Sequence, residues 1–309
     1  MKGSFRNTSR SALSGIPQKR YRAVIFDWDG TAVPSRTAPI DDVLPLMVRL
    51  LSAGMVLIII SGTTYENIAG GTLHHRTDRS LLGNLYLGLG RGAFDYGFEN
   101  GKPVVLHEFL PDDNLMREIH RLAFDFHMRL LAEHGYPTDI VFSRPNYCKV
   151  DLLVRHERGD KLYLDAMEID AVNHRLRAHG YEKGIRGLLD GITEMGRDRG
   201  LAVKATTDAK YLEVGLTTKE DNIVYFLSQV VMPKGIQPEE CAFWGDEFGY
   251  LADGVRGSDA HMITEVSRNS DFFDVSGSPL ALPDQVRAVS GGVRAFLRFL
   301  EYQADLVKR

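Results

Sequence analysis

A pair of carboxylates, Asp27 and Asp29, follows a short apolar run and precedes a Gly-Thr turn. Ser61 follows a second apolar run, Lys219 opens a predicted helix, and Asp246 follows a later predicted strand. Open α/β sheets bind ligands at the carboxyl ends of their strands, where these residues would meet. A carboxylate that attacks a phosphoryl anion needs a hard cation to neutralise both groups. The set predicts phosphoryl chemistry, with Asp27 and Asp246 as Mg²⁺ ligands and Lys219 as an added positive charge.

The hydrophobic pattern predicts a parallel α/β core that would hold these residues. Residues 21–26 and 55–60 are short apolar runs, as in strands covered by helices on both faces. An amphipathic segment that Asp41 and Asp42 open connects them, which makes a right-handed strand, helix and strand unit. Further strands are expected at 85–89, 241–244 and 261–264, with helices at 220–230 and from residue 293 onward.

Between residues 105 and 208 the pattern changes to that of an α+β insert. A hairpin turn at 99–102 precedes it, and a long amphipathic helix is expected from 115 to 130. Cys148, Val150 and Leu152 then alternate with polar residues, as in a half-buried antiparallel strand. A helix-rich stretch reaches about residue 199, and strands are expected at 201–206 and 211–214. We therefore assign residues 21–104 and 209–309 to the core and 105–208 to the insert.

Residues 1–20 contain five basic side chains and no acidic one, without the apolar segment of a secretory signal. We interpret them as a disordered basic tail, with a nucleic-acid arm or a transit peptide as the alternatives. The whole chain has 37 basic and 41 acidic residues and a net charge of -4, which gives no footprint for nucleic acid or an anionic membrane. No apolar run is long enough to span a membrane. We expect a soluble, cytoplasmic protein with a small-molecule partner.

The four signals also resemble, in order and spacing, the motifs of the haloacid dehalogenase superfamily of phosphohydrolases. The resemblance rests on the turn at 27–31, on Ser61, on Lys219 and on Gly245-Asp246. It implies that Asp27 is the nucleophile that forms an aspartyl phosphate. It also implies that Asp29 protonates the leaving oxygen, then activates water, and lends its backbone carbonyl to the metal.

The same resemblance assigns the phosphate contacts and the type of insert. Ser61, the Gly62 amide and Lys219 would hold the phosphoryl oxygens. Only 34 positions separate Asp27 from Ser61, but 158 separate Ser61 from Lys219, so the insert lies between the second and third motifs. This placement resembles the C2-capped branch, which includes the Cof-type, sucrose-phosphate and trehalose-phosphate phosphatases. It implies a Rossmann-like core with an α+β C2 cap.

The chain departs from the Cof pattern at two places. That pattern has a second acid four positions after the Gly-Asp aspartate, where this chain has Gly249 and Tyr250. Glu247 would then hold a metal-bound water, and Asp253 is a weaker candidate for the same role. Arg91 stands where the pattern has Asn, so the chain differs from the Cof subgroup here as well.

The insert contributes three candidate substrate contacts. Lys149 and Lys204 lie on the polar faces of predicted strands, and Arg144 lies in the turn before one of them. This face would meet substrate when the cap closes about hinges at 103–106 and 206–210, or would simply be solvated. We interpret the chain as a Mg²⁺-dependent phosphatase of a small phosphate monoester such as a phosphosugar. The alternatives are a phosphomutase of sugar phosphates and a non-catalytic, receiver-like module in which Asp27 accepts phosphate.

Overall fold

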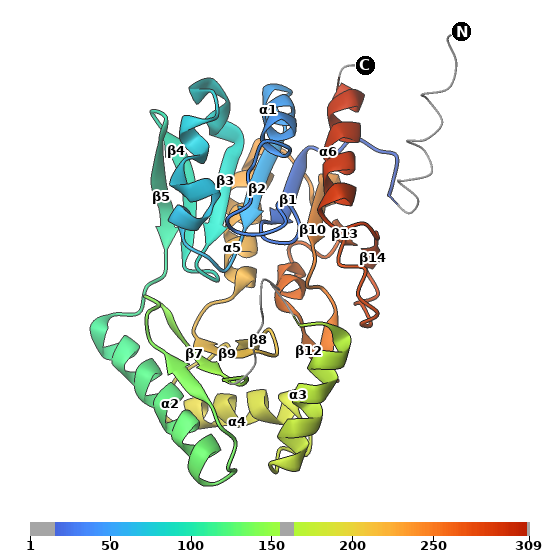
Figure 1. Cartoon of the computed structure of the whole chain (residues 1–309). Coiled ribbons are helices and arrows are strands. Elements are labelled where there is room, and N and C mark those ends of the chain that lie inside the picture. Colours follow the sequence, from blue (N-terminus) through green and yellow to red (C-terminus); the bar gives the residue numbers. More distant parts are fainter. Residues whose placement is uncertain (1–15, 155–163, 308–309) are drawn as a thin grey trace.

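The computed structural model describes residues 16–154 and 164–307 (Figure 1). The expected basic tail lies mostly outside the described residues, since only residues 16–20 of it are included. The chain forms a large sheet with helices on both faces, and a smaller sheet with helices on one face lies below it in Figure 1. No helix in the described ranges is long and apolar enough to cross a membrane.

The core sheet has eight strands, of which six are parallel. Its order is β14-β13-β10-β1-β2-β3-β4-β5, and only β4 and β5 run antiparallel to their neighbours as a hairpin at one edge. The strands are β1 (Ala23–Asp27), β2 (Val56–Ile60), β3 (Leu85–Leu89), β4 (Phe94–Glu99), β5 (Lys102–Glu108), β10 (Cys241–Gly245), β13 (Asp271–Asp274) and β14 (Val286–Ala288). The parallel strands place their carboxyl ends toward the smaller sheet (Figure 1).

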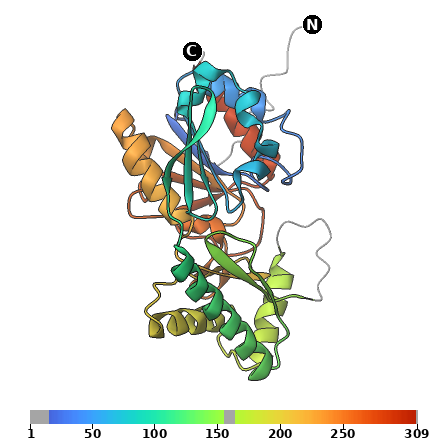
Figure 2. The ribbon, with the colours of Figure 1, turned by 90° about the vertical axis from the view of Figure 1, so that its left-hand side faces the viewer.

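Strands β1 and β2 are buried on both faces, which explains their continuous apolar sequences. Alternate side chains such as Phe26 and Ile59 pack with α1 (Leu44–Ser52) and α6 (Val293–Val307). The intervening ones, such as Ile25 and Ile58, pack with α5 (Lys219–Phe226) and the π-helical turn Leu227–Val231. Figure 2 shows α5 on one side of the sheet and α1 with α6 on the other. The expected three-layer α/β core is confirmed.

The insert is a cap with an antiparallel sheet in the order β6-β7-β9-β8. Its elements are α2 (Asp113–Ala132), β6 (Asp139–Val141), β7 (Tyr147–Asp151), α3 (Ala166–Ala178), α4 (Ile185–Asp198), β8 (Thr206–Thr207) and β9 (Tyr211–Gly215). Cys148, Val150 and Leu212 are fully buried against the three helices, as the alternation predicts. Residues of opposite parity, such as Lys149 and Glu213, therefore lie on the sheet face that turns toward the core.

The structure moves both predicted boundaries of the insert toward the C-terminus. Strand β5 pairs with β4 through Glu108, so the core continues four residues past position 104. Strand β9 pairs with β7 and β8, so residues 209–215 belong to the cap. The connecting segments are 109–112 and 216–218, whereas the expected hinges 103–106 and 206–210 lie within paired strands or the turn between them.

Two predicted strands are also wrong. Residues 201–205 form no strand, and β8 contains only Thr206 and Thr207. Around 261–264 the chain forms the 3-10 helix Ser258–Met262, and the strand of the core sheet comes later, at Asp271–Asp274. Ala260 and Met262 of the 3-10 helix are fully buried, and a short apolar run of this kind does not distinguish a buried turn from a strand.

The remaining elements are short connections. Strands β11 (Tyr250–Ala252) and β12 (Val255–Arg256) form a hairpin. Strand β11 contacts α3 and α4 of the cap, and β12 leads into the 3-10 helix Ser258–Met262. Other 3-10 helices are Tyr65–Asn67, Ala69–Gly71, Leu73–His75, Arg79–Asn84, Met232–Lys234 and Pro238–Glu240. Thr218 caps α5, because its hydroxyl accepts a hydrogen bond from the Glu220 amide, and this fixes the helix start at Lys219.

Candidate active site

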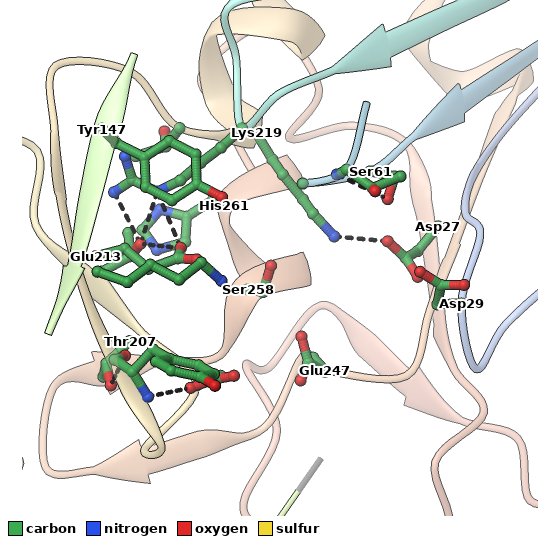
Figure 3. A pocket seen from close by; sticks show the side chains of 18 of the residues that line it. Asp27, Asp29, Ser61, Tyr147, Thr207, Glu213, Lys219, Glu247, Ser258 and His261 are labelled. Carbon is green, nitrogen blue, oxygen red and sulfur yellow. Dashed lines mark hydrogen bonds and ion pairs between the residues drawn. The ribbon is translucent and has the colours of Figure 1, made fainter. Parts of the chain in front are cut away.

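The four sequence signals meet in one cavity of about 470 Å³ between the core and the cap (Figure 3). Asp27 is the last residue of β1, Ser61 follows β2, Asp246 follows β10, and Lys219 is the first residue of α5. All four side chains are buried and line the cavity. The carboxyl ends of the parallel strands thus bring together residues that are far apart in the sequence, as expected.

Lys219 joins two of the buried carboxylates. Its Nζ donates hydrogen bonds to Asp27 Oδ1 and to Asp259 Oδ1, each at 2.7 Å. Burial lowers the pKa of Lys219, but the charges of Asp259 and Asp27 outweigh burial and hold the pKa well above its usual value. Lys219 is therefore a fixed positive charge. The second oxygen of Asp27, Oδ2, has no hydrogen-bond partner among the described residues.

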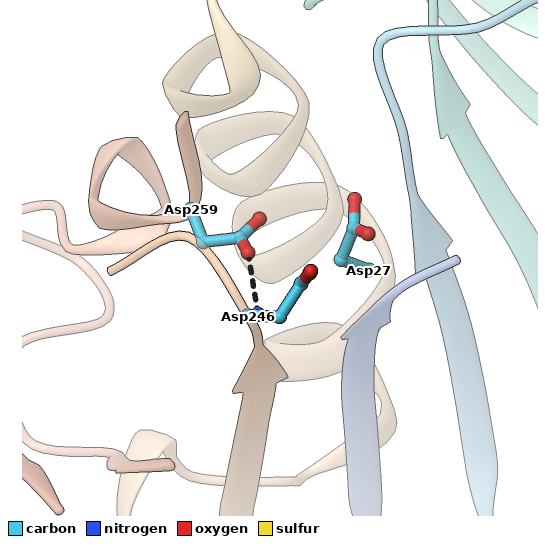
Figure 4. A group of neighbouring side chains, drawn as sticks. All are labelled: Asp27, Asp246 and Asp259. Atoms are coloured by element: carbon cyan, nitrogen blue, oxygen red, sulfur yellow. Dashed lines mark hydrogen bonds between the residues drawn. The ribbon is translucent and has the colours of Figure 1, made fainter. Parts of the chain in front are cut away.

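Asp27, Asp246 and Asp259 form a compact carboxylate cluster (Figure 4). One oxygen from each lies within 4.8 Å of the others. Burial, reinforced by the neighbouring carboxylates, raises the pKa of Asp27 to about 7 and the pKa of Asp246 well above its usual range. One lysine does not balance three buried carboxylates, and their donor atoms are all oxygen. The cluster therefore fits a hard divalent cation such as Mg²⁺.

Asp259 is the main site residue that the sequence reasoning missed. It is fully buried, and its Oδ2 accepts hydrogen bonds from the backbone amides of Asp246 at 2.9 Å and Glu247 at 2.8 Å. It therefore fixes the loop after β10 as well as Lys219. The sequence did not reveal Asp259 because a second acid was expected close to Asp246, and because a strand was expected at 261–264, which overlaps the end of this 3-10 helix.

Gly30 and Thr31 bring the turn after β1 against Asp246. Gly30 has a φ of +90°, and a Cβ at this position would overlap the Asp246 carboxylate. The Thr31 hydroxyl donates a hydrogen bond to Asp246 Oδ1 at 3.1 Å. Only glycine combines this conformation with so close an approach, which accounts for the Gly-Thr pair after the two aspartates.

Asp29 lies at the edge of the same cavity and is held by one of its two oxygens. Arg36 donates to Asp29 Oδ2 from Nη2 at 2.9 Å and from Nε at 3.1 Å. Asp29 Oδ1 is buried and has no hydrogen-bond partner in the described part of the chain. Asp29 therefore has a fixed orientation and one oxygen left for proton transfer. Arg36 was not anticipated from the sequence.

Ser61 lies next to Asp27 in the cavity (Figure 3), and Gly62 lines the cavity as well. The Ser61 amide donates to Gly88 O at 2.9 Å, which ties this loop to the end of β3. The Ser61 hydroxyl accepts a hydrogen bond from the Thr63 amide at 3.3 Å and donates to no described residue. Its proton is therefore available to an oxygen in the cavity.

Glu213 organises the wall of the cavity that the cap contributes. It lies 2.9 Å from Lys149 Nζ and 3.1 Å from Arg91 Nε, and it accepts a hydrogen bond from Thr206. Burial raises the pKa of Glu213, but Lys149 and Arg91 outweigh burial and lower the pKa to about 2. Arg91 comes from a core loop, has a positive φ of 59°, and also donates to Thr217 O at 2.6 Å. It therefore ties the core to the cap.

The structure separates the three cap residues expected to contact substrate. Arg144 and Lys149 line the cavity, whereas Lys204 is not among the lining residues that the structure describes. Lys204 Nζ instead pairs with Asp221 Oδ1 at 2.7 Å, on the first turn of α5. Residues 201–205 form no strand, so the alternation that placed Lys204 on a polar strand face does not apply.

The two candidates for the outer metal shell also have different positions. Glu247 lines the cavity (Figure 3), and burial together with Asp259 raises its pKa to about 8. Asp253 is exposed in the β11–β12 turn and lies outside the described lining of the cavity. His261, which the sequence reasoning did not select, also lines the cavity, and burial lowers its pKa to about 4.

No family model and no curated protein matches the sequence. Solved structures do match the fold, and the likeness extends over more than nine-tenths of this chain, so it covers both the α/β core and the inserted cap. A Plasmodium falciparum IMP-nucleotidase with IMP bound is 11% identical over 94% of this chain and 68% of its own, with a TM-score of 0.58. A Eubacterium rectale protein is 13% identical over 91% of this chain and 98% of its own, with a TM-score of 0.51. At these identities the likeness establishes the fold.

Proposed function

We propose that this protein is a Mg²⁺-dependent phosphatase that hydrolyses a small phosphate monoester. The observation that carries the proposal is the arrangement of Asp27, Lys219 and Asp246 at the carboxyl ends of the strands, with Asp29 beside them. The IMP-nucleotidase, which has the same fold and was solved with IMP, supports a phosphorylated metabolite as substrate.

Asp27, Asp246 and the backbone carbonyl of Asp29 would hold the metal, and Glu247 would hold one of its waters. Bound Mg²⁺ would neutralise the charge of the nucleophile and of the phosphoryl oxygens. Asp259 accepts hydrogen bonds with both oxygens, so its part is to hold Lys219 and the Asp246 loop in place.

The proposed chemical steps use the side chains that line the cavity. The free oxygen of Asp27 attacks phosphorus, and the bond between phosphorus and the ester oxygen breaks. Lys219, the Ser61 hydroxyl and the Gly62 amide bind the phosphoryl oxygens, whose charge grows in the transition state. Asp29 donates its proton to the leaving oxygen. Asp29 then takes a proton from the water that attacks phosphorus and releases Asp27, so inorganic phosphate leaves and the enzyme is restored.

The proposal is tested with the full chain and p-nitrophenyl phosphate, followed by a panel of phosphorylated metabolites that includes IMP. We expect turnover with Mg²⁺, none with excess chelator, and a loss of more than about a thousandfold in Asp27→Asn, equal to about 4 kcal/mol of barrier. Wild-type rates in this variant would contradict the mechanism. Transfer of phosphate to a second sugar phosphate, without release of inorganic phosphate, would instead identify a phosphomutase.

A further inference from the structure

The cavity carries opposite charges at its two ends. The catalytic end, next to the core strands, contains Asp27, Asp29, Asp246, Glu247 and Asp259 with two cations, Lys219 and Arg36. Among the described residues, the cap end contains three cations, Arg91, Lys149 and Arg144, with two carboxylates, Asp208 and Glu213. A bound divalent metal would offset most of the negative charge of the catalytic end, and it would leave the cap end unchanged, since its proposed ligands all belong to the catalytic end.

The cations of the cavity differ in whether the protein already pairs them. Those with a carboxylate partner are Arg36 with Asp29 at 2.9 Å, Arg91 with Glu213 at 3.1 Å, Lys149 with Glu213 at 2.9 Å, and Lys219 with Asp27 at 2.7 Å. Arg144 has no ion pair or hydrogen bond with any part of the chain that the structure describes. Its Nε is buried and unpartnered, which is costly for a charged group.

The position of Arg144 is fixed even though its guanidinium is unpaired. Arg144 lies in the turn between β6 and β7, and Asn146 of the same turn donates from Nδ2 to Gly90 O of the core at 2.8 Å. Tyr147, which follows, is buried and reaches into the cavity beside Glu213 (Figure 3). The turn is therefore held against the core, and it presents an unpaired cation at a defined place in the cavity.

We propose that Arg144 binds a second anionic group on the substrate, a carboxylate or a second phosphate, while the scissile phosphate lies at Asp27. This inference rests on the proposed phosphatase activity and specifies its substrate class. A guanidinium presents parallel N–H donors that match both carboxylate and phosphate, so either group would satisfy the buried Nε and balance the positive charge of the cap end. A neutral hydroxyl would accept the hydrogen bond from Nε but would leave the positive charge of Arg144 without a counter-charge.

Matched substrate pairs test this inference. Glycerol 3-phosphate and 3-phosphoglycerate differ by a carboxylate, and fructose 6-phosphate and fructose 1,6-bisphosphate differ by a second phosphate. We expect wild-type kcat/KM to favour the more anionic member of at least one pair by about 10- to 100-fold, because hydrogen bonds between charged groups are worth about 1.5–3 kcal/mol. The pair that shows the preference identifies the anion.

Variants of Arg144 then separate its role from general folding effects. Arg144→Ala should abolish the preference within the pair, and Arg144→Lys should retain part of it, since lysine keeps the charge and loses the planar donor pair. Arg121→Ala is the matched control, because Arg121 is an exposed arginine on α2 that pairs with Glu118, and it should leave the preference unchanged.

Three outcomes overturn the inference. If the wild type hydrolyses p-nitrophenyl phosphate with Mg²⁺ but shows no preference in either pair, the phosphatase proposal stands and the second-anion site is wrong. If the preference persists in Arg144→Ala, the anion is bound elsewhere. If no phosphate ester, including p-nitrophenyl phosphate, is hydrolysed, the proposed function fails and the inference fails with it.

Discussion

The two ends of the cavity are built in contrasting ways. At the catalytic end the core strands hold a surplus of carboxylates around one lysine, and nearly every group is fixed by a backbone or side-chain hydrogen bond. At the cap end Lys149 and Arg91 share Glu213, and Arg144 has no partner within the part of the chain that the structure describes. The first end needs a cation and the second needs an anion. This difference suggests that the core supplies the phosphoryl chemistry and the cap selects the rest of the substrate.

After Asp27, the largest change in turnover is expected from Asp29 at the catalytic end. We expect Asp29→Asn to lower steady-state turnover by about a hundred- to ten-thousandfold, because an amide does not transfer the protons that hydrolysis of the phosphoenzyme requires. Mg²⁺ affinity should largely remain, since the metal contact of this residue would be its backbone carbonyl. Metal titration with single-turnover kinetics separates the two effects, and loss of Mg²⁺ binding with normal catalysis at saturating metal would reverse the roles of Asp27 and Asp29.

A smaller loss of activity is expected when Asp259 is replaced, because Asp259 positions Lys219 and the Asp246 loop. Asp259→Asn should weaken the contact with Lys219 and the support of the Asp246 loop, and lower both apparent Mg²⁺ affinity and kcat by about 10- to 100-fold. Asp253→Asn is the matched control, since Asp253 is exposed and outside the described lining of the cavity. Equal behaviour of the two variants in a Mg²⁺ titration would show that Asp259 has no part in the site.

At the cap end, Glu213→Gln should affect stability more than chemistry. It leaves the buried Arg91 and the largely buried Lys149 without their counter-charge, which costs about 3 kcal/mol in the free energy of unfolding. The folded-state pKa of Glu213 is lowered from 4.5 to about 2, so its stabilisation is complete above pH 4.5 and is lost as the pH falls toward 2. The free energies of unfolding of the wild type and Glu213→Gln, measured in urea, should therefore differ less as the pH falls from 4.5 toward 2. A difference that stays constant over this range would show that the charge of Glu213 does not contribute to stability.

The smallest change in kcat/KM is expected when Lys204 is replaced. Lys204 and Asp221 form a partly exposed ion pair outside the described lining of the cavity, and such pairs contribute about 0–1 kcal/mol. Lys204→Ala should keep kcat/KM for the best substrate of the panel within about twofold of the wild-type value. A loss as large as that of Arg144→Ala would show that the two ends of the cavity are not divided as the structure indicates.

The sequence predicted the position of a side chain correctly where that position depends only on the strand that carries or precedes it. The apolar runs that become β1, β2 and β10 predict a sheet buried on both faces, and the residues after them had to meet at its carboxyl edge. Alternation in β7 likewise placed Lys149 on the polar face, because the side-chain period of a strand is two.

The remaining features depend on contacts between distant segments. Asp259 lies on a 3-10 helix, which has no hydrophobic period that the sequence reveals, and its partners Lys219 and Asp246 come from other elements. Arg91 lies far along the chain from Glu213, and only the folded structure shows that they pair. Lys204 was misplaced because strand alternation was applied to residues that form no strand.

In the proposed mechanism, Asp27 receives the phosphoryl group at the catalytic end of the cavity. The direct measurement is to mix enzyme, Mg²⁺ and the best substrate of the panel, quench with acid within one turnover, and map the peptides by mass spectrometry. We expect one added phosphoryl group on Asp27, at the highest level in Asp29→Asn and absent in Asp27→Asn. A phosphoryl group on another residue, or continued substrate turnover by Asp27→Asn, would contradict it.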